Sequence, residues 1–217
     1  MIHTLEADSI QLEFDGRSIL SDIYLKAETG KITGLLGRNG TGKSCLMKII
    51  YGSLKSEKSI RIDGYAQHEA LKQTGLLRYL PQFNFIPKSL SLQRICKDFE
   101  IDYDLFRNRF PGFASKHTAV AGSLSGGELR LVELYVIVKS VSHFALLDEP
   151  FTHLNPVQIE KVKELLLEEK INKGFVITDH MYQHVTAICD SLYVLANGKT
   201  HLTKSADDTV RLGYTRL

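Results

Sequence analysis

The chain has 217 residues, of which 43% are hydrophobic and 24% charged, and its formal net charge at pH 7 is +2. This length and composition predict one soluble globular domain with a sizeable core, and the near-balanced charge gives no electrostatic case for binding nucleic acid. Three widely separated cysteines, Cys45, Cys96 and Cys189, favour reduced thiols in a cytosolic protein over a disulfide framework.

No apolar run approaches the roughly 20 residues that a membrane-spanning helix needs. The N-terminal residues lack a charged segment followed by an apolar core, which a secretory leader would show. We therefore expect any role at a membrane to depend on partner subunits. The sequence also has no internal repeat and no low-complexity tract, which favours a single compact unit.

The N-terminal part of the chain reads as strands. Residues 10–14 and 19–26 alternate apolar and polar side chains, which predicts two half-buried strands of an antiparallel sheet. The continuous apolar run 32–36 predicts a buried parallel strand. A helix is expected to follow from about Gly42 to Tyr51, where Gly52 stops it.

Between this strand and this helix lies the segment Gly37-Arg38-Asn39-Gly40-Thr41-Gly42-Lys43-Ser44, which has the Gly-x4-Gly-Lys-Ser pattern of a phosphate-binding loop. Glycines let backbone N–H groups converge on phosphates, and the helix that follows offers its positive N-terminus. We expect Lys43 to reach the β- and γ-phosphates and the Ser44 hydroxyl to bind Mg²⁺, which prefers oxygen ligands. An ordinary tight turn is the simpler alternative, and the full pattern disfavours it.

The character of the sequence changes to helical between Gln82 and Leu124. Possible caps precede helical patterns over 92–99 and 105–110, which predicts a small helical insertion. After Ser125 the segment 129–138 is apolar nearly all round, as a buried helix would be. The short apolar runs 144–147 and 175–178 are each followed by a helical pattern and predict two further strands of a doubly wound sheet.

Charged residues directly follow both of these runs, where parallel sheets place their ligands. Adjacent acidic residues are usually only solvated, but Asp148 and Glu149 follow four apolar residues, and a buried pair of charges needs a ligand to offset its desolvation. Asp148 is suited to hold Mg²⁺. Glu149 is suited to polarise a water for in-line attack on a γ-phosphate.

Two further motifs follow the phosphate loop, namely Leu124-Ser125-Gly126-Gly127-Glu128 and Leu146-Leu147-Asp148-Glu149-Pro150. With all three in this order, the chain resembles ATP-binding-cassette (ABC) ATPases over almost its entire length. The resemblance implies a single α/β domain over 1–217 with a P-loop NTPase core, in which helices wrap a parallel sheet and an N-terminal antiparallel sheet is added. Residues 1–82 and 125–217 would form this core, and residues 83–124 an inserted helical subdomain.

The resemblance also implies roles for individual residues. Phe14 matches the aromatic residue that stacks on adenine, with a place in the core as the alternative. Gln82 matches a glutamine that contacts Mg²⁺ and the attacking water, although an isolated Gln would ordinarily be a surface residue. His180 matches a histidine that contacts the γ-phosphate and orients Glu149; a helical zinc pair with His184 is the competing idea, for which no third ligand is evident.

The implied sets are then as follows. The residues expected to bind ATP are Phe14, Gly37, Asn39, Gly40, Thr41, Gly42, Lys43, Ser44, Cys45, Ser125, Gly126 and Gly127, although Cys45 is also expected to pack as a small apolar residue. The expected Mg²⁺ ligands are Ser44, Gln82 and Asp148, and the expected catalytic residues are Glu149, His180 and Gln82.

In the family, the motif at Ser125, Gly126 and Gly127 faces the γ-phosphate bound by a different cassette. A second ABC ATPase subunit is therefore expected, with a head-to-tail homodimer favoured. One departure lies in Thr152-His153-Leu154-Asn155-Pro156, where the family commonly has Leu-Asp. Asn155 keeps an oxygen acceptor without the charge, which predicts weaker communication across the dimer, and it is a good N-cap for a helix beginning at Pro156.

We expect an ATP-hydrolysing subunit that drives a separate integral membrane permease from the cytoplasmic, inner face of the cell membrane. Phe83, Phe85, Ile86 and Pro87 either form the floor of a groove for that permease or belong to the core. The alternatives are a soluble ABC ATPase acting in assembly or regulation, which would carry the same motifs, and a nucleotide-binding protein with negligible turnover, against which Glu149 and His180 argue.

The C-terminal half, including segments within 175–195 and the ending 211–217, is similar to lipopolysaccharide-export and branched-chain amino-acid-import ATPases. The helical insertion differs from both. Substrate and direction of transport stay open, because a permease outside this chain sets them.

Overall fold

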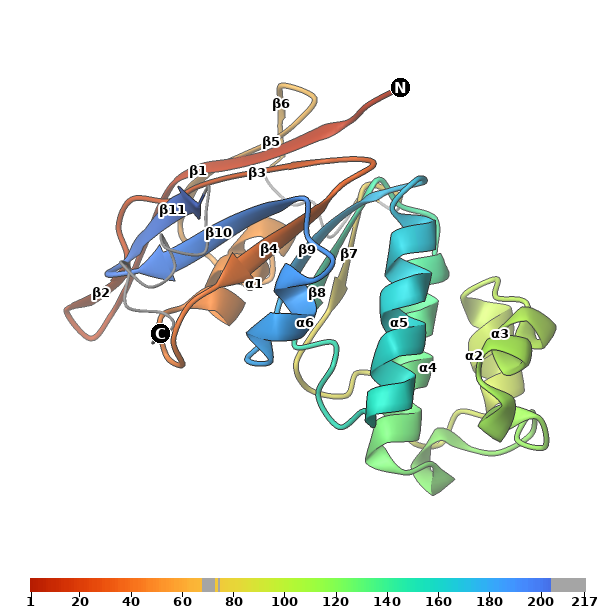
Figure 1. Cartoon of the computed structure of the whole chain (residues 1–217). Helices are drawn as coiled ribbons and strands as arrows, with labels where there is room; N and C mark the ends of the chain where they lie inside the picture. Colours follow the sequence, from red (N-terminus) through yellow and green to blue (C-terminus); the bar gives the residue numbers. More distant parts are fainter. Residues whose placement is uncertain (68–72, 74, 204–217) are drawn as a thin grey trace.

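A computed structural model of the chain describes residues 1–67, 73 and 75–203, so the ending 211–217 lies outside the described residues. Within that part, the strands form a five-stranded antiparallel sheet and a six-stranded, largely parallel sheet (Figure 1). The antiparallel sheet contains β1 (Thr4–Phe14), β2 (Arg17–Leu20), β3 (Tyr24–Glu28), β5 (Glu57–Ile62) and β6 (Tyr65–Ala66). The other sheet has the order β11-β10-β4-β9-β8-β7, with β4 (Ile32–Leu36), β7 (Leu77–Leu80), β8 (Phe144–Asp148), β9 (Gly174–Thr178), β10 (Ser191–Ala196) and β11 (Lys199–Thr203).

The prediction of one strand over 19–26 is wrong. The chain forms β2, leaves the sheet at Ser21 and resumes as β3, because the intervening residues pair with the turn between β10 and β11: Ser21 N donates to Gly198 O at 2.9 Å, and Asp22 forms a bridge with Lys199. β2 consequently pairs with the end of β1, and β3 with its beginning. The predicted strand 10–14 is confirmed but begins at Thr4, with a register shift against β5 after Asp8.

The predicted strand–loop–helix unit is confirmed. Every residue of β4 is buried, and α1 (Lys43–Tyr51) begins after Gly42 and ends at Gly52. Gly42 has a φ of 102° and Gly52 a φ of 94°, a left-handed backbone that glycine adopts without strain. This geometry places the start of α1 directly beyond the carboxyl end of β4.

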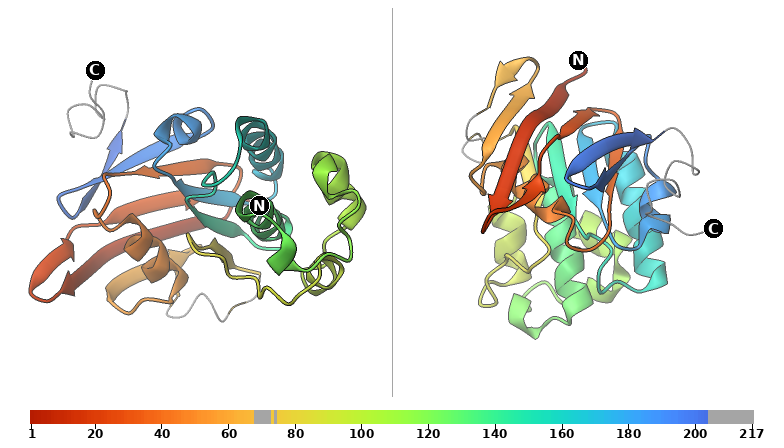
Figure 2. Two further views of the ribbon diagram at one scale, coloured as in Figure 1. Left: turned by 90° about the horizontal axis from the view of Figure 1, so that it is seen from below. Right: turned by 90° about the vertical axis from the view of Figure 1, so that its left-hand side faces the viewer.

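The helical pattern between Gln82 and Leu124 is also confirmed. α2 (Leu92–Asp98) is capped by Ser91, and α3 (Tyr103–Arg109) by Asp102. Two short 3₁₀ turns follow at Pro111–Phe113 and Ala121–Ser123. Figure 2 shows α2 and α3 standing outside α4, away from both sheets. They are held there by aromatic packing, with the ring centroid of Phe106 4.8 Å from that of Tyr135 in α4.

Helices cover both faces of the six-stranded sheet. α4 (Gly126–Lys139), α5 (Pro156–Glu169) and α6 (Tyr182–Thr186) pack on the face that includes Ala145 and Leu147 of β8, while α1 and the antiparallel sheet pack on the face that includes Leu146. The strands between them therefore read as continuous apolar runs. In the described part of the chain, no helix is both long and apolar enough to cross a bilayer.

Candidate functional site

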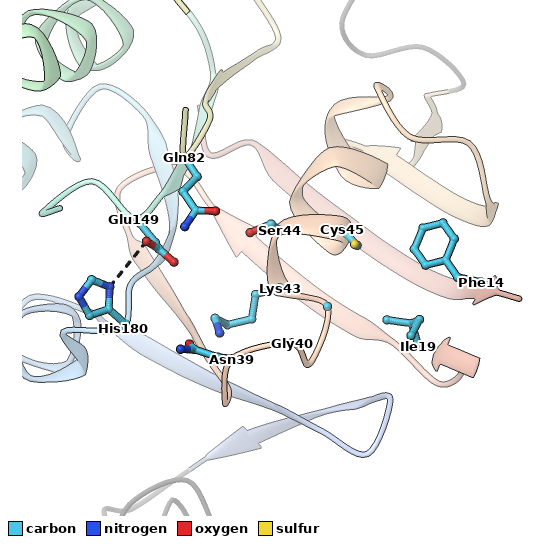
Figure 3. A pocket seen from close by; sticks show the side chains of 11 residues that line it. Phe14, Ile19, Asn39, Gly40, Lys43, Ser44, Cys45, Gln82, Glu149 and His180 are labelled. Carbon is cyan, nitrogen blue, oxygen red and sulfur yellow. Dashed lines mark ion pairs between the residues drawn. The ribbon is translucent and has the colours of Figure 1, made fainter. Parts of the chain in front are cut away.

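A groove of about 620 Å³ opens at the carboxyl ends of the central strands (Figure 3). Its lining comes from segments far apart in the sequence: Phe14, Ile19, Asn39, Gly40, Gly42, Lys43, Ser44, Cys45, Gln82, Glu149 and His180. All of these except Ile19 were predicted as site residues. The fold thus gathers the phosphate loop, Glu149 directly after β8 and His180 in the segment between β9 and α6 around one space.

The phosphate loop has the conformation that its glycines permit. Gly40 and Gly42 both lie in the left-handed region, with φ of 80° and 102°. At Gly37 an added Cβ would lie 2.7 Å from the carbonyl oxygen of Leu195, so the loop passes too close to β10 for any side chain. Thr41 closes the loop by donating from its hydroxyl to Arg38 O at 2.9 Å.

Lys43 lies across this loop with its ammonium group largely buried. Nζ donates to Gly37 O at 2.7 Å and to Arg38 O at 3.1 Å. Burial lowers the pKa of Lys43, and the carboxylates of Glu149 and Asp148 act in the opposite direction. The ammonium group therefore donates to two neutral carbonyl groups at the mouth of the loop.

Asp148 joins the phosphate loop to the central sheet. Ser44 Oγ donates to Asp148 Oδ1 at 3.1 Å, and Tyr79 OH donates to Asp148 Oδ2 at 3.0 Å. Burial raises the pKa of Asp148, which these two hydrogen bonds partly oppose, and burial also raises the pKa of Tyr79, so its phenol keeps the proton that it donates. The contact to Tyr79 was not predicted from the sequence.

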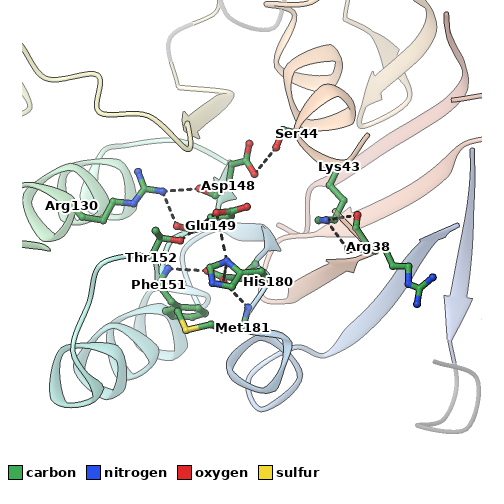
Figure 4. A network of polar contacts seen from close by, with 12 residues as sticks. Arg38, Lys43, Ser44, Arg130, Asp148, Glu149, Phe151, Thr152, His180 and Met181 are labelled. Carbon is green, nitrogen blue, oxygen red and sulfur yellow. Dashed lines mark hydrogen bonds and ion pairs between the residues drawn. The ribbon is translucent and has the colours of Figure 1, made fainter. Parts of the chain in front are cut away.

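Glu149 leaves β8 in a conformation unusual for its type, with a φ of 51°. Its N–H donates to Thr178 O at 2.7 Å, which ties it to β9, and its Oε2 accepts a hydrogen bond from Thr152 Oγ1 at 3.3 Å. His180 Nδ1 lies 3.6 Å from the same Oε2 (Figure 4). The predicted Glu149–His180 pair is thus brought together, with the imidazole half exposed at the groove.

The loops that carry this pair are fixed by a buried carboxylate. Asp179 accepts hydrogen bonds from Phe151 N at 3.0 Å and from Met181 N at 2.9 Å, and burial raises its pKa. Because its two oxygens hold the segments after β8 and after β9, the spacing of Glu149 and His180 follows from Asp179. The sequence showed this residue only as the neighbour of His180.

Arg130 is a second residue that the sequence analysis missed. This side chain, 2% exposed, donates to Pro81 O at 2.7 Å, to Asp148 O at 2.7 Å and to Glu149 O at 2.9 Å. Its neighbour in α4, Glu133, accepts from Phe85 N at 2.7 Å and Ile86 N at 3.1 Å. The signal was the presence of two charged residues, Arg130 and Glu133, within the otherwise apolar segment 129–138, since a buried charge must be paired.

The chain is similar to known proteins in both sequence and fold. Residues 20–152 match the ABC transporter family. The chain belongs to that family. This ABC ATPase is 27% identical over 225 residues to the lipopolysaccharide export system ATP-binding protein LptB of Haemophilus influenzae, covering 95% of this chain and 92% of that protein. It is 30% identical over 210 residues to a probable ABC transporter ATP-binding protein of Azorhizobium caulinodans, covering 90% of this chain and 75% of that protein.

The fold of the ABC ATPase is shared with solved structures. The structure of an ATP-binding subunit of an ABC transporter superposes with a TM-score of 0.79 at 21% identity, covering 97% of this chain and 93% of that one. The predicted α/β fold with an antiparallel and a parallel sheet is therefore confirmed. Membership of the family implies that the chain binds and hydrolyses ATP.

Five of the predicted ATP-binding residues of the ABC ATPase do not line the groove. Gly37 and Thr41 belong to the phosphate loop itself, whereas Ser125, Gly126 and Gly127 lie at the start of α4. Ser125 caps α4, its hydroxyl accepting from Glu128 N at 3.3 Å while its own N–H donates to Glu128 Oε2 at 2.9 Å. An added Cβ at Gly127 would lie 2.5 Å from His153 O, so the start of α4 touches the loop after Glu149. Gly126 lies between them, where an added Cβ would meet no atom within 4 Å.

The exposed fractions of the side chains decide the alternatives for Phe14 and for the apolar residues after Gln82. Phe14 is 47% exposed on the rim of the groove, so its place in the core is wrong. After Gln82, Phe83 is 63% exposed whereas Ile86 is buried, so the apolar residues there divide between surface and core.

The helical histidine pair and the predicted cap are settled by contacts. His180 precedes α6, and His184 packs edge-on against Phe151 at 5.6 Å, so the two histidines do not share one helix. The predicted cap at Asn155 is confirmed, with Gln158 N donating to its Oδ1 at 2.9 Å.

Proposed function

We propose that the chain is the ATP-binding and ATP-hydrolysing subunit of an ABC transporter. Residues 1–82 and 125–217 act as its nucleotide-binding core, and 83–124 as its helical subdomain. The observation that carries the proposal is the 3.1 Å hydrogen bond between Ser44 and Asp148, because it joins the phosphate loop to the carboxylate at the end of β8 beside one groove. The names of the relatives, which are ATP-binding proteins of transport systems, support the same conclusion.

ATP would lie along the groove with its base toward Phe14 and its phosphates over the loop from Gly37 to Ser44. The exposed ring of Phe14 offers a stacking face. Lys43 exchanges two neutral carbonyl acceptors for phosphate oxygens, and it gains by the exchange because the new acceptors carry negative charge.

The residues around Asp148 suit Mg²⁺. Ser44 and Asp148 present oxygen atoms 3.1 Å apart, and Gln82, which lines the same groove, offers a further oxygen. Oxygen donors with a single carboxylate are what a magnesium ion bound to phosphates ordinarily uses. Bound there, the ion supplies positive charge that neutralises the phosphates.

Glu149 carries the hydrolytic step in this proposal. Its carboxylate faces the groove and accepts a proton from the water that attacks the γ-phosphate, which frees a lone pair on that water. Thr152 holds one carboxylate oxygen and His180 approaches the same oxygen, so both fix the direction of the base. The NH edge of His180 at the groove is also available to the γ-phosphate.

The motif at Ser125, Gly126 and Gly127 indicates a second copy. None of these residues lines the groove of its own chain, yet they open a long helix with bare backbone, as a phosphate site requires. A head-to-tail homodimer would bring them to the ATP of the partner. In the transporter, a permease would hold this dimer at the inner face of the membrane, with Phe83 exposed beside Gln82 for contact.

The test is Glu149→Gln, which keeps the shape of the side chain and removes its basicity. Hydrolysis should slow by about 100-fold or more while ATP binding persists. Light scattering in saturating MgATP should then show the mass of a dimer. The matched control, Glu149→Gln combined with Lys43→Ala, should remain a monomer. A monomeric Glu149→Gln protein with ATP demonstrably bound contradicts the homodimer.

Coupling to transport needs a separate experiment. A multispanning membrane protein that copurifies with the tagged chain, and that raises its ATPase rate when reconstituted, supports the transporter. A stable soluble complex without any membrane protein supports the alternative role in assembly or regulation.

A further inference from the structure

Both carboxylate oxygens of Asp148 accept hydrogen bonds, and they accept them from different parts of the fold. Oδ1 accepts from Ser44 at the start of α1, and Oδ2 accepts from Tyr79 in β7 at 3.0 Å. Ser44 is a predicted Mg²⁺ ligand, so its hydroxyl would turn an oxygen lone pair toward the ion. Tyr79 belongs to no motif of the site and does not line the groove.

The sheet places Tyr79 where it can reach Asp148. β7 and β8 are parallel neighbours, and Tyr79 lies opposite Leu146, two residues before Asp148. Residues two apart on a strand share a face, so the side chains of Tyr79 and Asp148 lie on the same face of the sheet. The two residues are about 7 Å apart along the strands, a distance that the length of a tyrosine spans.

The ring of Tyr79 is itself held in place. It packs against the cluster of buried residues between the two sheets, and its centroid lies 5.3 Å from that of Tyr51 at the end of α1. Tyrosine has only two side-chain torsions, so packing of the ring fixes the position of its hydroxyl group. The hydroxyl is therefore a rigid donor to Oδ2, whereas Ser44 lies at the edge of a loop that binds phosphates.

We propose that Tyr79 is a positioning residue for the metal site: by holding Oδ2, it directs Oδ1 of Asp148 toward Ser44 and the ion. The proposal rests on the function proposed above. Its general basis is that carboxylate ligands are oriented by hydrogen bonds from outside the coordination sphere, and loss of such a partner typically costs 10- to 100-fold in metal affinity. When the Ser44 hydroxyl turns toward the ion, the hydrogen bond from Tyr79 to Oδ2 is the one that Asp148 keeps.

The test is Tyr79→Phe, which removes the hydroxyl and keeps the ring. Tyr51→Phe is the matched control, because its ring packs against Tyr79 in the same cluster and the same atom is removed. The probe is Mn²⁺, titrated into each protein with a saturating non-hydrolysable ATP analogue and followed by electron paramagnetic resonance. We expect Tyr79→Phe to weaken Mn²⁺ binding by about 10-fold or more, and Tyr51→Phe to leave it within about two-fold of the parent.

Two further measurements separate positioning from folding. Affinity for the analogue in EDTA, which requires the folded phosphate loop but no metal, should be equal in all three proteins. In steady-state hydrolysis Tyr79→Phe should need more Mg²⁺ for half-maximal rate, and its kcat should recover at saturating Mg²⁺. A loss that no Mg²⁺ concentration restores, accompanied by weaker binding in EDTA, would mean damage to the fold and overturns the proposal.

The remaining outcomes distinguish this role from the proposed function. Unchanged Mn²⁺ affinity in Tyr79→Phe overturns the role of Tyr79 and leaves the ATPase intact. Equal losses in Tyr79→Phe and Tyr51→Phe assign the effect to packing between the rings, which also overturns it. A parent protein whose Mn²⁺ affinity does not rise with the nucleotide analogue contradicts the Mg²⁺–ATP site itself.

Discussion

Replacing Arg130 by Met tests the connection between α4 and the two segments that carry Gln82 and Glu149. The guanidinium is buried and donates three hydrogen bonds to the carbonyl groups of Pro81, Asp148 and Glu149. Methionine has a similar length and keeps most of the apolar contact, so the change removes the donors and the charge. It also leaves the Glu133 carboxylate buried without its ion-pair partner, because Oε2 of Glu133 lies 3.8 Å from Nη1 of Arg130 in the parent protein.

The size of the effect follows from these contacts. A hydrogen bond from a charged group contributes about 1.5–3 kcal/mol, and breaking a buried ion pair by removing one partner costs about 3–5 kcal/mol. These figures describe the same atoms, so they are not added, and we expect the free energy of unfolding to fall by about 3–5 kcal/mol. That is a large part of the roughly 5–15 kcal/mol typical of a domain.

The measurement is urea unfolding followed by circular dichroism, with the slope m compared between proteins to verify that the same surface is exposed. The double variant Arg130→Met, Glu133→Gln is the matched control. It should recover at least half of the loss, because it removes the negative charge left without its cation and keeps an oxygen that accepts from Phe85 N and Ile86 N. Burial already raises the pKa of Glu133, which shows that the carboxylate is costly to hold there. A loss below about 1 kcal/mol, or a double variant no more stable than the single one, would refute the reasoning.

Three further predictions follow from other parts of the structure. Lys43→Ala should abolish tight MgATP binding in calorimetric titration, since it removes the cation of the phosphate loop; affinity within a few-fold of the parent would count against that assignment. Ser125→Arg should bind ATP normally, because Ser125 lies outside the groove of its own chain. It should lose turnover, because the larger cation would block the ATP of the partner in the proposed homodimer, and normal hydrolysis would exclude a composite site. Burial lowers the pKa of Lys173 to about 8 from 10.5, against an opposing effect of Glu169. Between pH 8 and 10.5 Lys173 carries its proton in the unfolded chain but loses it in the folded one. The parent should therefore gain stability relative to Lys173→Met as the pH rises from 8 to 10.5. Melting temperatures of both proteins across that range test the sign, and a constant difference would contradict it.

The sequence could predict the features that depend on residues close together in the chain. The phosphate loop is defined by glycines whose backbone conformation depends on their immediate neighbours, and the runs before Gly37 and Asp148 are apolar because parallel strands are buried on both faces. The break between β2 and β3 could not be predicted in this way. It depends on Gly198, which lies far away in sequence and accepts the hydrogen bond from Ser21.

The same limit applies to the partners of the site residues. Tyr79 reads as one more strand residue until β7 and β8 are placed in register, and Arg130 reads as an interruption of an apolar helix until three carbonyl groups surround it. Motifs identify the residues that face a ligand, because the ligand requires those residues at a fixed spacing along the chain. The residues that hold these ligand-facing residues in place come from other elements of the fold, so they stand at no fixed spacing from the motif.

In the proposed homodimer, the close approach of Gly127 to the carbonyl group of His153 has a consequence for pairs of one altered and one normal subunit. Gly127 belongs to the face that a subunit would offer to its partner's ATP, whereas His153 belongs to the loop that follows its own Glu149. A side chain at position 127 would push that loop and the start of α4 apart, and so would displace both the loop after Glu149 and the face offered to the partner's nucleotide. One altered subunit would therefore disable both nucleotide sites of the pair, so such a substitution should be dominant over the normal copy when both are expressed in one cell.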